Sequence, residues 1–514
     1  MATHNDDTRL KDVGLEEYDP ATVTWTAEEE RKIVRKLDFR LLPLLWVLFM
    51  LSFLDRSNIG NANTAGMSKD LGMSNDQYQW LLTIFYIGYA LGQPTMLLWK
   101  VFPPHAYVAA LVLCWGGFAL LQPTAHWAGL MVLRLFLGIA ETAFSPGMTF
   151  FLTFFYGRRE VGFRQGLYAG AAAIASCYAG ALAYGISQAK NSSIAVWKLL
   201  FLVEGAPAIL MVPVAYYFLP DRPSKARFLT PKEKAISIAR TQREGATGRE
   251  EGLKSAGVFA GFKDPKAYLC ALCYFGCNVS YSSLPVFLPT ILKEMGFSSI
   301  RAQGLSAPPY LAAFIVEVAA CYAADKVGDR SLFIIPLSLL GAVGYLVLAV
   351  TTATAARYTA IFLCACGIFP VIGLMLPFTA SMHADDSRRG AAFLILNLIG
   401  QCGPFLGTRM YPSNEGPYYR KGMWVSCAFM FVVMVTAIAL RFLLTLENRR
   451  LDRQYGYVDP KAQLRAPLGS EKQPVAPDAA ASASEEEDGK NESRDRETVE
   501  TQEDGVNRKW RYLL

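Results

Sequence analysis

The feature that most constrains this chain is a series of twelve apolar stretches, each about as long as a membrane-crossing helix. A helix needs roughly 20 apolar residues to cross the hydrocarbon core, whereas barrel strands would be about half that length and would alternate in polarity. The pattern therefore predicts an all-α integral membrane protein. The expected spans are Phe39–Ser57, Gln77–Trp99, Ala106–Gln122, Trp127–Phe144, Gln165–Ser187, Trp197–Leu219, Ala267–Leu292, Gly304–Ala324, Ser331–Val350, Tyr358–Ser381, Ala391–Thr408 and Met423–Leu446.

The composition agrees with a membrane protein. Apolar residues make up 52% of the chain and charged residues 18%, below the share of about one quarter in soluble domains. Residues 485–504 contain ten acidic and three basic side chains, a net charge of −7, so the rest of the +6 chain carries +13. These values exclude an ordinary soluble enzyme, a disordered protein and a nucleic-acid-binding protein.

The distribution of Lys and Arg predicts the orientation of the spans. With the N-terminus in the cytosol, the inner loops carry more than twice as many of these residues as the outer loops, so both termini are expected inside. A long cytosolic loop divides the spans six plus six, which favours a duplicated transporter fold. The expected parts are an N-terminal tail (1–38), a six-helix bundle (39–219), a central loop (220–266), a second six-helix bundle (267–446) and a disordered cytosolic tail (447–514).

The central loop contains one helix signal of its own. Thr230 can cap a helix, Pro231 suits its first position, and Glu233 completes a capping box. We therefore predict a short helix that ends at about Arg243.

The cysteines do not indicate a metal or redox centre. All ten lie in apolar stretches, and Cys270, Cys273 and Cys277 share one helical face, which we interpret as small apolar packing. The sequence also has no nucleophile–base pair, metal-ligand spacing or phosphate-binding loop. We expect neither an enzyme nor a cofactor, apart from a proton as the coupling ion.

Ionisable residues inside the predicted spans are the main candidates for a functional site, because each costs about 2.5–3.5 kcal/mol on insertion scales. Asp55 and Arg56 lie in the first span, and Arg134 and Glu141 lie in the fourth. The helical rise places Asp55 and Arg134 at similar depth in the outer half of the membrane. Glu141 follows Arg134 by two turns on the same face, so the four side chains are expected to form a ladder of acids and bases.

This ladder has two interpretations. In the structural one, Asp55 and Arg134 form an ion pair that fastens the first span to the fourth. In the functional one, Arg56 and Arg134 bind a substrate anion, to which a guanidinium offers two parallel hydrogen bonds, while Asp55 and Glu141 carry protons. Neighbours on a helix point about 100° apart, so Asp55 and Arg56 cannot both face a central cavity squarely. We favour the functional interpretation.

Three more charged residues lie within the spans. Glu204 stands beside Gly205 in the sixth span, where we favour helix capping or packing. Glu317 lies near the middle of the eighth span and is assigned to proton coupling, with substrate contact as the alternative. Arg441 is close enough to the inner face to snorkel.

Two spans carry unusual polar side chains. The seventh contains Asn278 and Tyr281 ahead of two prolines, and such a helix must line a cavity or pack against protein. The eleventh offers Asn397 and Gln401, one turn apart on one face. Both sets are candidates for substrate binding, and hydrogen bonding between helices is the alternative.

Short segments distributed over nearly the whole membrane core carry a family resemblance. They are residues 54–62 (LDRSNIGNA), 134–141 (RLFLGIAE), 145–147 (SPG), 220–223 (PDRP), 287–291 (FLPTI), 308–310 (PPY), 388–390 (RRG) and 416–418 (GPY). The chain resembles the major facilitator superfamily and, within it, the fungal allantoate permease family of anion:cation symporters. Those proteins carry allantoate, nicotinate, pantothenate and similar compounds.

The resemblance implies proton-coupled import of a small organic anion by alternating access. It assigns substrate and proton binding to Asp55, Arg56, Arg134 and Glu141. Residues 325–330 (DKVGDR) resemble the superfamily's cytosolic loop motif, whose charges bridge helices, and so Asp325, Gly328 and Arg330 are the expected cytosolic gate. The equivalent loop of the first half, residues 99–104, lacks the acidic residue.

Two other functions compete with import. An efflux transporter for a fungal metabolite would share the fold, but the charged residues of the first and fourth spans argue for anion symport. A nutrient-sensing membrane receptor would need its C-terminal tail for function. The expected protein is a multi-pass monomer of the plasma membrane, with a small organic anion, a proton and the lipid bilayer as its partners and no nucleic acid.

Overall fold

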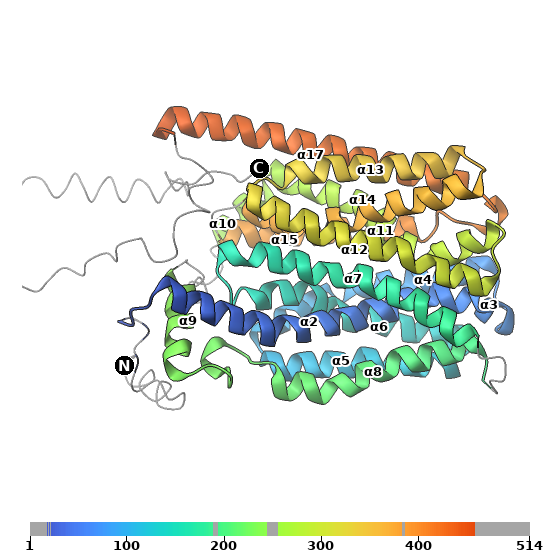
Figure 1. Ribbon diagram of the computed structural model, residues 1–514, viewed down its shortest axis with the longest axis horizontal. Helices are drawn as coiled ribbons and strands as arrows, with labels where there is room; N and C mark the ends of the chain where they lie inside the picture. Colours follow the sequence, from blue (N-terminus) through green and yellow to red (C-terminus); the bar gives the residue numbers. More distant parts are fainter. Residues whose placement is uncertain are drawn as a thin grey trace, which may run out of the picture.

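The computed structural model of the chain describes residues 18, 20, 22–188, 194–243, 255–382 and 386–457. Long helices run side by side along the long axis of the molecule (Figure 1). The helices of the first half are α2 (Ala27–Thr64), α3 (Met67–Asp70), α4 (Asn75–Leu91), η1 (Gln93–Lys100), α5 (Pro104–Leu121), η2 (Gln122–Thr124), α6 (Trp127–Leu152), α7 (Arg158–Ser187) and α8 (Val196–Phe218).

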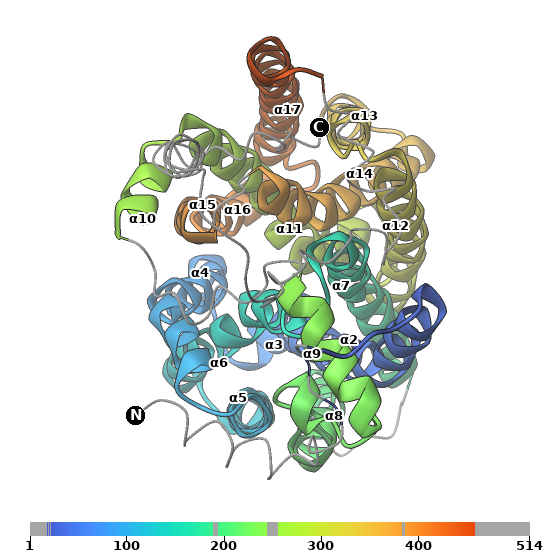
Figure 2. The same cartoon turned by 90° about the vertical axis from the view of Figure 1, so that its left-hand side faces the viewer.

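The central loop and then the second half follow the first half along the chain, as predicted. The connection contains η3 (Pro223–Lys225), α9 (Pro231–Arg243) and α10 (Ser255–Phe262). The second half contains α11 (Pro265–Glu294), α12 (Ser299–Val327), α13 (Ser331–Val350), α14 (Thr354–Ser381), α15 (Asp386–Gly400), α16 (Gly403–Gly407), η4 (Ser413–Glu415) and α17 (Arg420–Tyr455). Viewed from the end that carries α9, the two halves lie one above the other (Figure 2).

Within the described residues, eleven helices are long and apolar enough to cross a membrane. The expected span missing from these eleven is the second, Gln77–Trp99, which the structure breaks after α4, a helix of 17 residues. Gly92 and Pro94 stand at this break, where proline removes a backbone donor and the chain continues as the 3-10 helix η1. The predicted span Ala391–Thr408 is broken in the same way, because Gly403 and Pro404 begin α16.

Two helices extend beyond the spans predicted from the sequence, and one predicted loop helix is confirmed. Helix α2 begins twelve residues before Phe39, because Thr26 and Glu29 form a capping box (Glu29 N to Thr26 Oγ1, 3.2 Å). Helix α17 continues past Leu446 to Tyr455, so the expected disordered tail does not begin at 447. The predicted loop helix is confirmed as α9, and its Thr230 and Glu233 exchange hydrogen bonds of 2.8 and 3.3 Å.

Glycine allows the helices to pack very closely. A Cβ on Gly88 of α4 would overlap the backbone of Leu135 in α6, and a Cβ on Gly138 of α6 would overlap that of Phe85 in α4. Small residues of this kind commonly bring membrane helices together, since packing replaces the hydrophobic effect in lipid. The fourth span, which carries Arg134 and Glu141, is therefore held firmly against α4.

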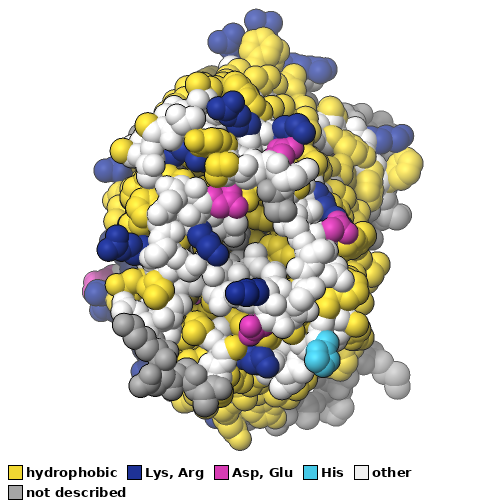
Figure 3. All heavy atoms as spheres, turned by 90° about the vertical axis from the view of Figure 1, so that its right-hand side faces the viewer, with side chains coloured by type: hydrophobic (Ala, Val, Ile, Leu, Met, Phe, Trp, Pro, Cys, Tyr) yellow, Lys and Arg dark blue, Asp and Glu magenta, His cyan; other side chains and the backbone are white. Residues whose placement is uncertain are grey.

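The two halves touch at the end opposite α9, which the loop charges assign to the outside. Thr83 Oγ1 lies 3.1 Å from Thr408 Oγ1, and Arg409 Nη1 lies 2.8 Å from Asp76 Oδ1. Gly60 of α2 also packs directly on the backbone of Val286 in α11. These contacts close the outer end of the interface. Figure 3 views this end and shows basic and acidic side chains scattered over it, with apolar side chains on its flanks.

Candidate functional site

The central ion pair of the structure joins Arg56 of α2 to Glu141 of α6. Nη2 and Nε of Arg56 lie 3.0 and 3.2 Å from Glu141 Oε2, so two of the three guanidinium nitrogens donate to one carboxylate oxygen. The side chain of Glu141 is fully buried and that of Arg56 is 14% exposed. Such a pair is stable in a low-dielectric region only while both partners stay charged, because removal of one charge leaves the other unpaired.

Aromatic rings surround the guanidinium of Arg56. Its Cζ lies 4.9 Å from the ring centre of Tyr89, 5.2 Å from that of Phe85 and 5.6 Å from that of Phe53. Cation–π contact of this kind stabilises a desolvated cation by about 2 kcal/mol. Arg56 is thus held in place by rings as well as by Glu141.

A row of rings continues from this cage into the second half. Phe53 of α2 lies 5.4 Å from Tyr281 of α11, centre to centre, and Tyr281 lies 5.0 Å from Phe369 of α14. Phe369 in turn lies 5.5 Å from Tyr310 of α12. The row crosses the interface between the halves, so the site is built by both of them.

Asp55 points away from its neighbour Arg56, as the helical angle requires. It is 2% exposed, and its Oδ2 finds no hydrogen-bond partner among the described residues. Arg134 is buried to the same degree, with its Cζ 6.0 Å from the ring of Phe201 in α8. The structural interpretation is therefore wrong in detail, because the ion pair that forms is Arg56–Glu141 and the described residues show none between Asp55 and Arg134.

Glu204 does not cap a helix. Its side chain is fully buried in α8, one turn beyond Phe201, and neither carboxylate oxygen has a hydrogen-bond donor within the described part of the chain. Of the two expected roles, the structure shows burial in the packed interior and not helix capping.

Glu317 of α12 lies between two glycines. A Cβ on Gly373 of α14 would stand 2.5 Å from Glu317 Oε1, and a Cβ on Gly170 of α7 would stand 3.6 Å from its Cδ. The side chain is 1% exposed. Since α7 belongs to the first half and α14 to the second, the carboxyl group of Glu317 lies at the interface that must rearrange when the halves move.

Only some of the polar residues predicted in the second half lie at the site. Tyr281 belongs to the row of rings, and Asn278, one turn nearer the cytosol, is 4% exposed. The amide of Asn397 instead donates to the carbonyl of Phe393 on its own helix, at 2.9 Å. Gln401 stands in the turn between α15 and α16.

The expected cytosolic gate residues do come together. Arg330 Nη2 lies 2.9 Å from Asp325 Oδ1, and Arg330 Nη1 donates to the carbonyl of Pro377 on α14 at 3.3 Å. Gly328 ends α12 with a φ of 71°, a conformation that glycine adopts easily. A Cβ on Gly162 of α7 would stand 2.5 Å from Arg330 Nη2, so this cluster also touches the first half.

Arg441 of α17 lies near these gate residues, and its guanidinium is bound to protein groups. Its Nη1 lies 2.8 Å from Asp329 Oδ2 and donates to Ser331 Oγ at 2.8 Å. The ion pair ties α17 to the loop between α12 and α13. The predicted snorkelling is corrected to a specific contact.

Sequence reasoning missed the residues that position the charges. Phe85 and Tyr89 are ordinary apolar positions of a span, and Gly170 and Gly373 are two of 41 glycines. The one usable signal was the i, i+4 spacing of Phe85 and Tyr89, which places both rings on one face of α4.

Comparison with known proteins agrees with this architecture. A profile of the Major Facilitator Superfamily matches residues 45–408. An uncharacterized transporter of Schizosaccharomyces pombe is 33% identical over 436 residues, which cover 83% of this chain and 89% of that protein. The high-affinity nicotinic acid transporter of Saccharomyces cerevisiae is 29% identical over 443 residues, covering 85% of this chain and 82% of that protein.

Solved structures share the fold at low sequence identity. The proton:xylose symporter XylE superposes with a TM-score of 0.61 at 16% identity, covering 78% of this chain and 94% of that one. A bacterial homologue of the lysosomal transporter Spinster, in an inward-facing conformation, gives 0.57 at 15% identity, with coverage of 78% and 96%. The matching family and these relatives are transporters, so the chain is a multi-pass membrane transporter and not an enzyme. The chain belongs to the major facilitator superfamily.

Proposed function

We propose that this chain is a proton-coupled importer of a small organic anion, of the kind carried by the allantoate permease family. The observation that carries the proposal is the buried pair between Arg56 and Glu141, at 3.0 Å. A guanidinium in a membrane transporter binds carboxylates well, and a carboxylate beside it is a group that can exchange a proton. The yeast relative with a nicotinic acid substrate supports a carboxylate as the cargo.

The pair couples proton and anion by competition. While Glu141 is ionised it accepts from Nε and Nη2 of Arg56 and neutralises the charge of the guanidinium, so a substrate carboxylate is attracted only weakly there. A proton on Glu141 ends this ion pair, and Arg56 then turns its fork to the substrate. After both are released, the pair forms again and neutralises the empty site, which lets the unloaded transporter return.

The other buried charges have supporting roles in this scheme. Arg134 lies nearer the outer end than Glu141 and meets the arriving anion when the outer end opens, while Asp55 and Glu317 are additional proton carriers. Asn278, Tyr281, Asn397 and Gln401 supply contacts to the rest of the substrate from the second half.

The row of rings favours a flat substrate. Phe53, Tyr281 and Phe369 follow one another at 5.0 to 5.4 Å, and aromatic faces at this spacing suit a planar ring bound between or against them. A heteroaromatic carboxylate places its charge at Arg56 and its ring along this row. We place the transporter in the plasma membrane as a monomer.

Uptake of labelled organic acids in a transport-deficient yeast tests the proposal. The panel contains nicotinate, benzoate, pantothenate and allantoate, each measured with and without a proton uncoupler and with an empty vector as control. We expect uncoupler-sensitive accumulation of at least one carboxylate. A lower internal concentration in expressing cells than in empty-vector cells would instead assign the protein to efflux, and uncoupler-insensitive uptake would rule out proton coupling.

A further inference from the structure

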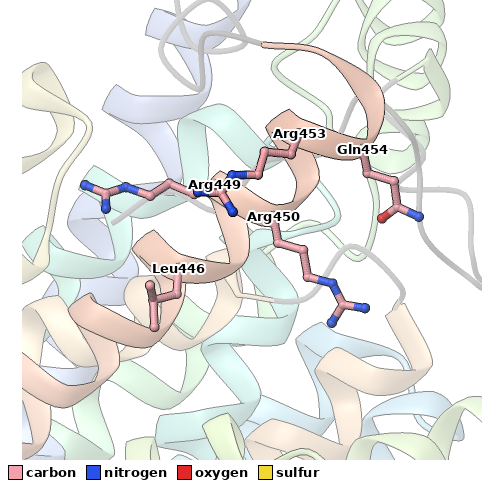
Figure 4. Close-up of a pocket in the computed structure, with 5 residues that line it drawn as sticks. All are labelled: Leu446, Arg449, Arg450, Arg453 and Gln454. Carbon is pink, nitrogen blue, oxygen red and sulfur yellow. The ribbon is translucent and has the colours of Figure 1, made fainter.

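The cytosolic end of α17 carries three exposed arginines, Arg449, Arg450 and Arg453, which the transport mechanism does not use. With Leu446 and Gln454 they line a shallow hollow on the last turns of the helix (Figure 4). In Figure 1 this end of α17 projects beyond the neighbouring helix α13. The arginines therefore stand outside the packed bundle and are free to meet another molecule.

The arginines continue the lipid-facing side of the helix. Val435, Ile438, Phe442 and Leu446 are 58%, 46%, 63% and 44% exposed, and their spacing places them on one face. At 100° per residue, Arg449, Arg450 and Arg453 all fall within about 60° of Leu446 on that same face. The opposite face packs on the protein through the buried residues Val433, Ala437, Leu440 and Leu444.

The length of the apolar face fixes the level of the arginines in the membrane. Trp424, 48% exposed, begins this face at the outer end, and Leu446 ends it. The 22 residue steps between them span roughly 33 Å, close to the ~30 Å of the hydrocarbon core. Arg449 and Arg453 then lie roughly 4.5 and 10 Å beyond the core, in and just past a headgroup layer that is about 5–8 Å thick.

Acidic neighbours do not neutralise this group of arginines. Glu447 turns to α11, where its Oε2 lies 2.9 Å from Lys266 Nζ. Asp452 is the other acidic residue between 446 and 455, and three arginines less this one carboxylate leave a charge of +2. A guanidinium binds phosphate through two parallel hydrogen bonds.

We infer that Arg449, Arg450 and Arg453 form a binding site for the phosphate of anionic phospholipid headgroups in the cytosolic leaflet. The site lies at the depth of those phosphates, faces the lipid, and carries the opposite charge. Bound lipid fixes the end of α17, and α17 is tied by Arg441 to Asp329 in the cytosolic loop of the gate. The inference is independent of which substrate the protein carries.

The test uses the purified full-length chain in nanodiscs of phosphatidylcholine with a fraction of phosphatidylserine, and counts retained phosphatidylserine by native mass spectrometry. Each basic residue near such a surface changes lipid affinity about fivefold, so R449Q/R450Q/R453Q is expected to weaken retention by on the order of a hundredfold. The matched control K69Q/K293Q/R301Q removes three exposed basic residues from the outer end and is expected to retain the lipid.

Further variants separate the possible occupants. R449K/R450K/R453K keeps the charge and is expected to retain most of the lipid, which would tie the loss in the glutamine variant to the missing positive charge. Equal retention by the glutamine variant and the native chain would overturn the inference. It would also be overturned if retention appeared only after removal of residues 460–514, whose acidic segment would then be the occupant, or if inorganic phosphate displaced the lipid.

Discussion

Arg56 reaches across from α2 to α6 and places Nη2 3.0 Å from Glu141 Oε2, whereas its neighbour Asp55 is 2% exposed and its Oδ2 has no hydrogen-bond partner among the described residues. The side chains of these two adjacent residues therefore have different surroundings. Arg56 lies at the interface between the halves, where the rings of Tyr281 and Phe369 continue the site.

The first prediction concerns Glu141→Gln. Glutamine keeps the shape of the side chain but carries no charge and takes no proton, so Arg56 stays available to the anion at every pH. We expect loss of proton-driven accumulation, with exchange of labelled for unlabelled substrate retained. Both are measured in proteoliposomes, with Glu447→Gln at the cytosolic surface as a control. Normal accumulation at mildly acidic pH would move the coupling role to Asp55 or Glu317.

The second prediction concerns the closed outer end. A Cβ on Gly60 would overlap the carbonyl of Val286 across the two halves, so Gly60→Ala forces α2 and α11 apart. Overpacking of this kind costs roughly 1–3 kcal/mol, enough to shift the protein toward an outward-open state. We expect faster alkylation of a cysteine placed at Asn61 by an impermeant reagent added outside.

Gly117→Ala is the matched control for this experiment, because a Cβ on Gly117 of α5 meets nothing within 4 Å among the described residues. Equal alkylation of Asn61→Cys in the Gly60→Ala and Gly117→Ala backgrounds would show that this contact does not hold the outer end closed.

The positions of the spans could be read from the sequence because the bilayer demands one long apolar run for each crossing. Thr230 and Glu233 likewise predicted the start of α9 from local chemistry alone. The break at Gly92 and Pro94 was missed because a span that bends still looks apolar throughout. The length of α17 was missed because the polar segment after Leu446 contains good helix formers, which a hydropathy pattern ignores.

The candidate site was harder to predict than the fold. All four charged residues were identified, since a charge in a span needs a reason, but their pairing was not. Whether α2 presents Asp55 to Arg134 or Arg56 to Glu141 depends on its rotation against α6, which side-chain packing decides. The role of Gly170 and Gly373 could not be predicted, because only the packing of α7 and α14 against α12 brings them beside Glu317.

The third prediction separates transport from signalling. The acidic residues between 485 and 504 follow the second six-helix half in the sequence. Truncation after Asp459 removes them and is expected to leave uptake within a few-fold of normal, measured per molecule at the cell surface. An inactive truncated protein that reaches the membrane would favour the receptor interpretation.

The last prediction concerns Arg134. Its side chain is buried beside Phe201, nearer the outer end than Glu141, so an anion that enters from outside meets this guanidinium early. Arg134→Lys keeps the charge but loses the planar fork, and the apparent KM is expected to rise about tenfold, which corresponds to one charge-assisted hydrogen bond of about 1.4 kcal/mol. Arg134→Ala removes the charge near Asp55 and is expected to abolish uptake and to lower the amount of folded protein. Uptake is therefore measured beside surface expression. If Arg134→Lys reaches the membrane and transports with a normal KM and rate, Arg134 serves only to hold the helices together and does not bind substrate.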